Sequence, residues 1–192
     1  MSSRFDEIAS AEEANALLEI QAPDGSLAVY STSSNVTLTD TLHERWIEMG
    51  SDGKVEVVST QPGRVDEQLE LSGGYKLRIR FEPPLSPGKH TFEIQTKFFD
   101  SFLKQDEFFT LTIKYPIRHL RFKIKFPRNV PVTSASVVRF DPSTGPTATK
   151  VQEDLPSLKQ EENSWYEIQW TKENPKINSV YRINWSWYPQ RS

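Results

Sequence analysis

Two runs of alternating cations are the polar feature with the clearest spacing in this sequence of 192 residues. Each run places a Lys or Arg at every second position, between apolar residues. The six cations are Lys76, Arg78, Arg80, Arg121, Lys123 and Lys125. Because the side chains of a strand alternate between its two faces, each trio shares one face. If the two strands are neighbours, all six form one basic surface that could orient a protein partner or bind nucleic-acid phosphates.

The aromatic residues of these runs favour a protein partner over nucleic acid. They alternate with the cations and therefore lie on the opposite face, whereas a platform that stacks bases needs rings and cations together. We predict recognition of a protein through strand edges or loops, with the basic face setting orientation. The predicted contact residues are Arg78, Arg80, Arg121, Lys123 and Lys125, with Trp165 as an anchor.

A module that binds carbohydrate or another small ligand is the alternative offered by four C-terminal tryptophans. These are Trp165, Trp170, Trp185 and Trp187. A sugar-stacking platform needs at least two of them exposed and coplanar. Trp185 and Trp187 instead alternate in step with Tyr181, which is typical of a face packed in a core. Trp165 and Tyr188 fall off that face and are the better candidates for exposed contacts.

Residue types that commonly perform catalysis are missing or badly spaced. There is no cysteine, and His43, His90 and His119 are far apart and lack metal-binding spacing. No serine lies in a Gly-x-Ser-x-Gly elbow. The acidic pairs are adjacent in sequence, so their carboxylates point to opposite faces of a strand and form no dyad. We expect a non-enzymatic protein that needs neither a metal nor a cofactor.

The net charge of -3 conceals an uneven distribution. Residues 1–74 carry 4 basic and 14 acidic residues, and residues 75–128 carry 12 basic and 5 acidic ones. Residues 129–192 carry 7 of each. The acidic first third and the basic middle can neutralise each other in the fold, or present opposite faces to partners.

Short alternating runs separated by turn residues must position all these side chains. The clearest are residues 75–81 and 118–126, and Pro-rich or Gly-rich turns follow such runs along the chain. About nine or ten strands without intervening helices predict an all-β, antiparallel, immunoglobulin-like sandwich. The break at Tyr115-Pro116 favours two closely packed modules, 20–115 and 116–192. One continuous sandwich over 20–190 is the alternative.

Two local features predict further elements. Ser10 and Glu13 have capping-box spacing, which predicts a short helical lead-in within residues 1–19, over residues 8–19. Alternating residues 43–49 and 54–58 flank a turn at Asp52-Gly53, which predicts a β-hairpin.

Three segments resemble the non-catalytic β-sandwich regions of bacterial multidomain signalling or defence proteins. They are Pro83–Gly88, Tyr115–Pro127 and Tyr181–Trp187. The resemblance implies a cytoplasmic sensing or interaction module attached to an effector domain, and it transfers no catalytic residue.

The N-terminus and the overall hydropathy predict a cytoplasmic location. No basic start followed by an apolar stretch marks a secretion signal. No run of about 18 apolar residues predicts a membrane span. A chain without cysteine also fits a reducing compartment.

Overall fold

The computed structural model describes residues 4–127, 130–141, 150–160 and 166–188. Nearly all of these residues lie in strands. The elements are α1 (Arg4–Ile8), β1 (Ala9–Ile20), β2 (Leu27–Leu38), β3 (Leu42–Gly50), β4 (Lys54–Gln61), β5 (Arg64–Leu71), β6 (Gly74–Leu85), β7 (Gly88–Phe99), β8 (Asp106–Ile113), β9 (Ile117–Lys125), β10 (Val132–Phe140), β11 (Val151–Gln152), β12 (Ser157–Gln160), β13 (Tyr166–Glu173) and β14 (Ser179–Trp187). The prediction of an all-β sandwich with one short N-terminal helix is confirmed. No helix in the described ranges is long and apolar enough to cross a membrane.

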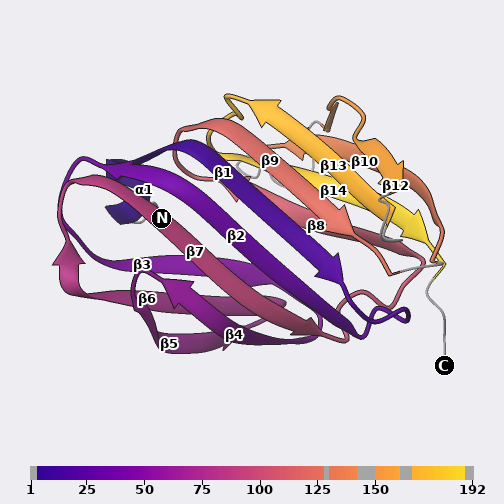
Figure 1. Cartoon of the computed structure of the whole chain (residues 1–192), viewed down its shortest axis with the longest axis horizontal. Helices are drawn as coiled ribbons and strands as arrows, with labels where there is room; N and C mark the ends of the chain where they lie inside the picture. The colour runs from indigo at the N-terminus through magenta and orange to yellow at the C-terminus, as the bar shows by residue number, and fades with distance from the viewer. Residues whose placement is uncertain (1–3, 128–129, 142–149, 161–165, 189–192) are drawn as a thin grey trace.

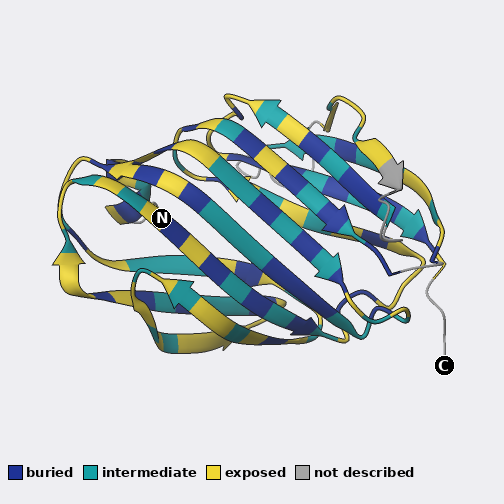
Figure 2. Ribbon diagram, in the orientation of Figure 1, coloured by how far each residue is buried: buried dark blue, intermediate teal, exposed yellow. Residues whose placement is uncertain are grey.

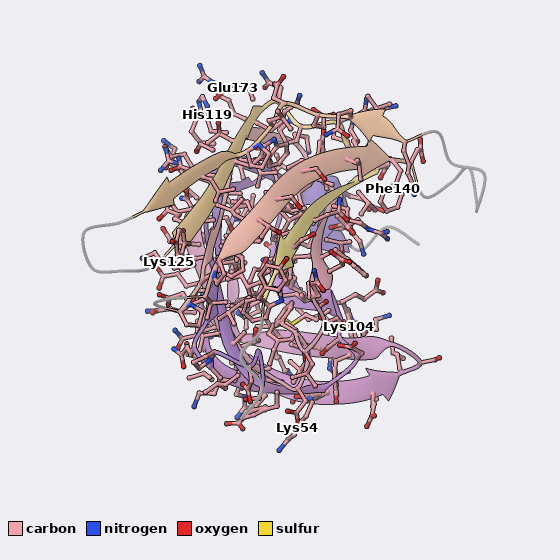
Figure 3. The ribbon with its side chains drawn as sticks, turned by 90° about the vertical axis from the view of Figure 1, so that its right-hand side faces the viewer. Lys54, Lys104, His119, Lys125, Phe140 and Glu173 are labelled. Atoms are coloured by element: carbon pink, nitrogen blue, oxygen red, sulfur yellow. The ribbon has the colours of Figure 1, made fainter. Side chains whose placement is uncertain are left out.

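The strands form three sheets in two layers (Figure 1). The large sheet has seven strands in the order β12-β13-β9-β1-β2-β7-β4. A four-stranded sheet, β11-β10-β14-β8, and a three-stranded sheet, β3-β6-β5, lie side by side on one face of it (Figure 3). The pairing of β1 with β9 is parallel, and the other paired strands are antiparallel. The large sheet therefore hydrogen-bonds strands from both sides of Tyr115-Pro116, and the division into modules at that point stays a prediction.

The predicted helix over residues 8–19 is wrong. The helix comprises Arg4–Ile8, and Ala9–Ile20 form a strand between β2 and β9. Hydrogen bonding on both sides outweighs a capping-box pattern whose helix would be short and only weakly amphipathic. A bulge between Ala11 and Glu13 shifts the alternation, so buried residues are odd-numbered before it and even-numbered after it.

The predicted hairpin around Asp52-Gly53 is also wrong. β3 pairs with β6 in the three-stranded sheet, whereas β4 pairs with β7 in the large sheet. The turn therefore carries the chain from one layer to the other. A Cβ atom at Gly53 would lie 1.8 Å from the carbonyl oxygen of Phe99, so glycine is needed for this close passage. Alternation predicts each strand but does not say which sheet it joins.

The core lies between the two layers, and buried and exposed residues alternate along the strands of the large sheet (Figure 2). Trp185, Trp187 and Tyr181 are among the largest fully buried side chains, which confirms the predicted core face of β14. Leu77, Ile79 and Phe81 of β6 are buried in the same core, as their alternation predicted.

Paired truncations in β1 distinguish a strand from a helix in solution. Leu18 is fully buried on the inner face, whereas Leu17 is half-buried on the outer one. We expect Leu18→Ala to lower the free energy of unfolding by about 2–5 kcal/mol, because it leaves a cavity. Leu17→Ala should cost under about 1 kcal/mol. Urea denaturation measures both values, and equal losses would contradict the strand orientation described here.

Candidate functional site

A cleft of about 680 Å³ separates the two smaller sheets. Its walls are β3 and β8, which are the terminal strands of their sheets. Successive residues of each strand line the cleft, Arg45–Gly50 on one side and Phe108–Ile113 on the other. Because consecutive side chains of a strand point to opposite faces, a wall of consecutive residues is a strand edge. The cleft is therefore bounded by two edges whose outward backbone groups pair with no other described strand.

Ion pairs join the two walls near both ends of the cleft. Lys114 Nζ lies 3.6 Å from Glu48 Oε2, and Lys104 Nζ lies 3.1 Å from Asp52 Oδ2. Figure 3 shows Lys104 at the level between the upper four-stranded and lower three-stranded sheets. Asp52 follows Glu48 along the chain, whereas its partner Lys104 precedes Lys114, the partner of Glu48. The two edges therefore run antiparallel. All four side chains are well exposed, so water and salt screen both pairs and each contributes little to stability.

Small side chains of the large sheet form the floor of the cleft. Ala14 of β1 pairs with Ser34 of β2, and Ala16 pairs with Thr32. All four residues line the cleft. Their positions on the inner face would normally carry large apolar side chains, as Leu18 does in the same strand. The volume that these residues leave empty is the physical origin of the cleft.

Arg45 and Tyr115 line one end of the cleft, where both pack against Phe5. The Arg45 guanidinium lies 4.0 Å from the centre of the Phe5 ring, and the Tyr115 ring packs edge-on against Phe5. Burial is the main cause that raises the pKa of the Tyr30 hydroxyl, and the nearby Tyr115 adds to it, while the Arg45 cation opposes the shift. The Tyr30 ring itself packs against Phe98 and Phe109.

Glu107 is buried at the opposite end, with 7% of its surface exposed. The backbone N–H of Lys104 donates a hydrogen bond of 2.8 Å to Glu107 Oε1. Burial raises the pKa of Glu107, although this hydrogen bond and the charge of Lys104 oppose the shift. Ser51 and Ser101, whose hydroxyl oxygens are 2.9 Å apart, complete a polar end.

The raised pKa of Glu107 predicts a pH-dependent gain from removing its charge. The folded state binds this proton more tightly than the unfolded chain, so the contribution of Glu107 to stability falls as pH rises above about 4.5. The free energy of unfolding of Glu107→Gln relative to wild type should therefore increase with pH. Thermal denaturation across that range measures the difference. The exposed Glu56→Gln is the matched control, and a Glu107→Gln difference that is constant with pH would contradict the prediction.

The two predicted basic runs do not form one surface. Arg78 and Arg80 lie on β6 in the three-stranded sheet, whereas Arg121, Lys123 and Lys125 lie on β9 in the large sheet. Sequence could not decide this point because it does not specify which strands are neighbours.

Acidic residues neutralise the cations on β6. Arg78 lies 2.7 Å from Asp66 and 3.1 Å from Glu67, and Arg80 lies 3.0 Å from Glu82. Lys76 lies 3.9 Å from Glu48. Most of these carboxylates come from the acidic first third, so the mutual compensation weighed from the charge distribution does occur.

The cations of β9 lie on the outer face of the large sheet, where Figure 3 shows Lys125 pointing away from the core. Arg121 and Lys123 line a shallow hollow of about 450 Å³ together with polar residues of β1, β2 and β7. Lys123 also lies 3.2 Å from the buried carboxylate of Glu167. Trp165, the predicted anchor, falls outside the described residues.

The described residues assemble neither the carbohydrate platform nor a metal site at the histidines. Trp170, Trp185 and Trp187 are buried, so at most one of the four tryptophans remains for the carbohydrate platform, which needs two. Tyr188 is exposed, as predicted. His90 contacts the carbonyl oxygen of Ser86 and His119 contacts Glu173, and no cluster of three potential metal ligands occurs within the described segments.

The cleft itself was not predicted. Its signal in the sequence is the run of small or polar residues at inner-face positions 14, 16, 32 and 34. That signal becomes readable only when the bulge in β1 and the pairing of β1 with β2 are known, because these bring the four residues together.

No protein-family model matches this sequence, and no curated protein matches it. Solved structures do share the fold. A variant of an M1 zinc metallopeptidase from Deinococcus radiodurans matches with a TM-score of 0.57 and 11% identity over 92% of this chain and 42% of that chain. A two-domain M1 zinc metallopeptidase bound to L-tryptophan matches with a TM-score of 0.58 and 11% identity, over 95% and 43%. A candidate protease from Parabacteroides distasonis matches with a TM-score of 0.56 and 13% identity, over 95% and 41%.

At these identities the likeness establishes a shared β-sandwich fold and nothing more specific. The chain spans about two fifths of the length of the structures it matches. The resemblance to bacterial signalling or defence regions stays a prediction, because these matches do not address it.

Proposed function

We propose that this chain is a non-enzymatic binding module that takes up an extended segment of a protein partner in the cleft between β3 and β8. The observation that carries the proposal is that two strand edges face each other across one cavity. An edge offers N–H and C=O groups to an added strand, and this backbone pairing is a recurring mode of peptide recognition.

The dimensions of the cleft suit such a segment. The wall strands have nine and eight residues, which correspond to about 26–30 Å of extended chain. The volume of about 680 Å³ lies within the range of about 300–1,000 Å³ that is typical of ligand sites. Because the two edges are antiparallel, an inserted strand is parallel to one edge and antiparallel to the other.

Several features support a role in binding rather than catalysis. The chain spans about two fifths of the M1 zinc metallopeptidase chain that shares its fold. At the Glu107 end of the cleft, Lys104 forms an ion pair with Asp52, and its backbone N–H donates a hydrogen bond to Glu107. These polar groups therefore have structural partners. We propose a cytoplasmic location for the module, consistent with a chain that lacks cysteine.

The outer face of the large sheet is a second candidate surface for a protein partner. Arg121 is exposed there beside Lys123, in a hollow lined by serine, asparagine and glutamine side chains. Arg78 and Arg80 are weaker candidates because their charges are paired within the chain.

Filling the floor of the cleft tests the proposed function. We expect Thr32→Leu to preserve folding, because the added methyl groups occupy space that is empty, and to abolish capture of the partner. Thr37→Leu makes the same substitution at an exposed position on the opposite face of β2, outside both candidate surfaces, and should leave capture unchanged. Pull-down from lysate of the source organism, with and without nuclease and analysed by mass spectrometry, compares these variants with wild type.

The same experiment separates the two surfaces. A partner retained by Thr32→Leu but lost by the double variant Arg121→Glu/Lys123→Glu would assign binding to the outer face and refute the cleft. A partner lost only after nuclease treatment would indicate nucleic acid instead. Thermal denaturation of each variant verifies that loss of capture does not reflect unfolding.

A further inference from the structure

We infer that the end of the cleft formed by Arg45 and Tyr115 binds a carboxylate of the inserted segment. This inference rests on the proposed function, since it specifies the chemistry of the segment that the two edges would hold. The carboxylate is either an Asp or Glu side chain or the free C-terminus of the segment.

Arg45 is the residue that recognises this group. Its guanidinium stacks on Phe5 at 4.0 Å and approaches Phe92 at 5.5 Å, so the aromatic rings hold it in place at the cleft. No carboxylate within the described part of the chain forms an ion pair with it. A guanidinium has five N–H donors, and stacking on a ring leaves the donors at its edge available for a bidentate contact with a carboxylate.

Tyr115 supplies a neutral donor beside this cation. The Tyr115 ring packs edge-on against Phe5, with 5.1 Å between the ring centres, and Arg45 lies over the same Phe5 ring. One cation and one neutral hydroxyl group match a group with a single negative charge and two acceptor oxygens. A phosphate monoester carries nearly twice that charge and matches this set less well.

Other charged groups at this end limit how strongly the carboxylate is held. Asp6 of α1 lines the same end and opposes a second negative charge through space. Lys114 also lies there but is 3.6 Å from Glu48, so its charge is partly compensated. A carboxylate should therefore bind more tightly when Asp6 is neutral.

The test is a selection of random octapeptides against the whole chain. One library displays the peptides with a free C-terminus, and the other fuses both of their ends to a carrier. We expect both libraries to yield β-prone peptides. Selection of the acidic residue at one fixed position in both libraries would identify a side-chain carboxylate, whereas an affinity that requires the free end would identify the C-terminus.

Variants then measure the contribution of Arg45 with synthetic versions of the selected peptides. Arg45→Met, which keeps an apolar side chain on Phe5, should weaken an acidic peptide about tenfold or more. It should leave the matched amide peptide (Gln for Glu, Asn for Asp, or a C-terminal amide) unchanged. Arg45→Lys should give an intermediate affinity, and Asp6→Asn should bind the acidic peptide more tightly. Isothermal titration calorimetry gives each dissociation constant.

The outcomes distinguish this inference from the proposed function. Peptides that bind and are blocked by Thr32→Leu, but show no acidic preference or no sensitivity to Arg45→Met, would overturn the carboxylate site and leave the cleft as a peptide site. Failure to select any peptide, or selection unaffected by Thr32→Leu, would overturn the proposed function itself. An equal loss for acidic and amide peptides in Arg45→Met would show a structural role for Arg45 and also overturn the inference.

Discussion

The pairing of β1 with β2 on one side and β9 on the other holds the two halves of the chain together. β1 pairs along its whole length with β2, its neighbour in sequence, and in parallel with β9, about a hundred residues later. Parallel neighbours require a long connection, and here that connection contains β2 to β8. This strand therefore joins both halves in the large sheet, and the pairing of β8 with β14 joins them again in the four-stranded sheet.

The second layer is divided into two sheets, whereas the first layer is one continuous sheet. If β3 and β8 were paired, the two smaller sheets would form one layer of seven strands facing another of seven. The residues beneath these two edges, such as Ala16 and Thr32, are too small to fill the space between the layers. The cleft between β3 and β8 therefore stays open. Unpaired edges usually carry a risk of aggregation. Facing each other within a cleft, with ion pairs near its ends, these two edges are shielded from uncontrolled pairing with another sheet.

The cations of β6 are paired within the chain, whereas Arg121 on the outer face of the large sheet is more accessible to a partner. Carboxylates of the first third approach the cations of β6 closely, as Asp66 does at Arg78, so this face stabilises the fold more than it attracts partners. On that outer face Arg121 is exposed, and Lys123 forms an ion pair with the buried carboxylate of Glu167. The acidic and basic segments of the sequence thus meet unevenly in space, because strand order brings some together and keeps others apart.

Alternation along the chain is enough to establish the fold class and the core face of the strongest strands. The alternation of Tyr181, Trp185 and Trp187 specifies a buried face wherever β14 lies, since a strand has only two faces. Long-range packing determines the rest: that Ala9–Ile20 form a strand, that β3 and β4 belong to different sheets, and that the basic runs are separated. It also determines the cleft, because small residues create a cavity only where pairing places Ala14, Ala16, Thr32 and Ser34 together beneath two unpaired edges. Local patterns set which face of a strand is buried, but the choice of neighbouring strand depends on packing contacts between residues distant in the chain.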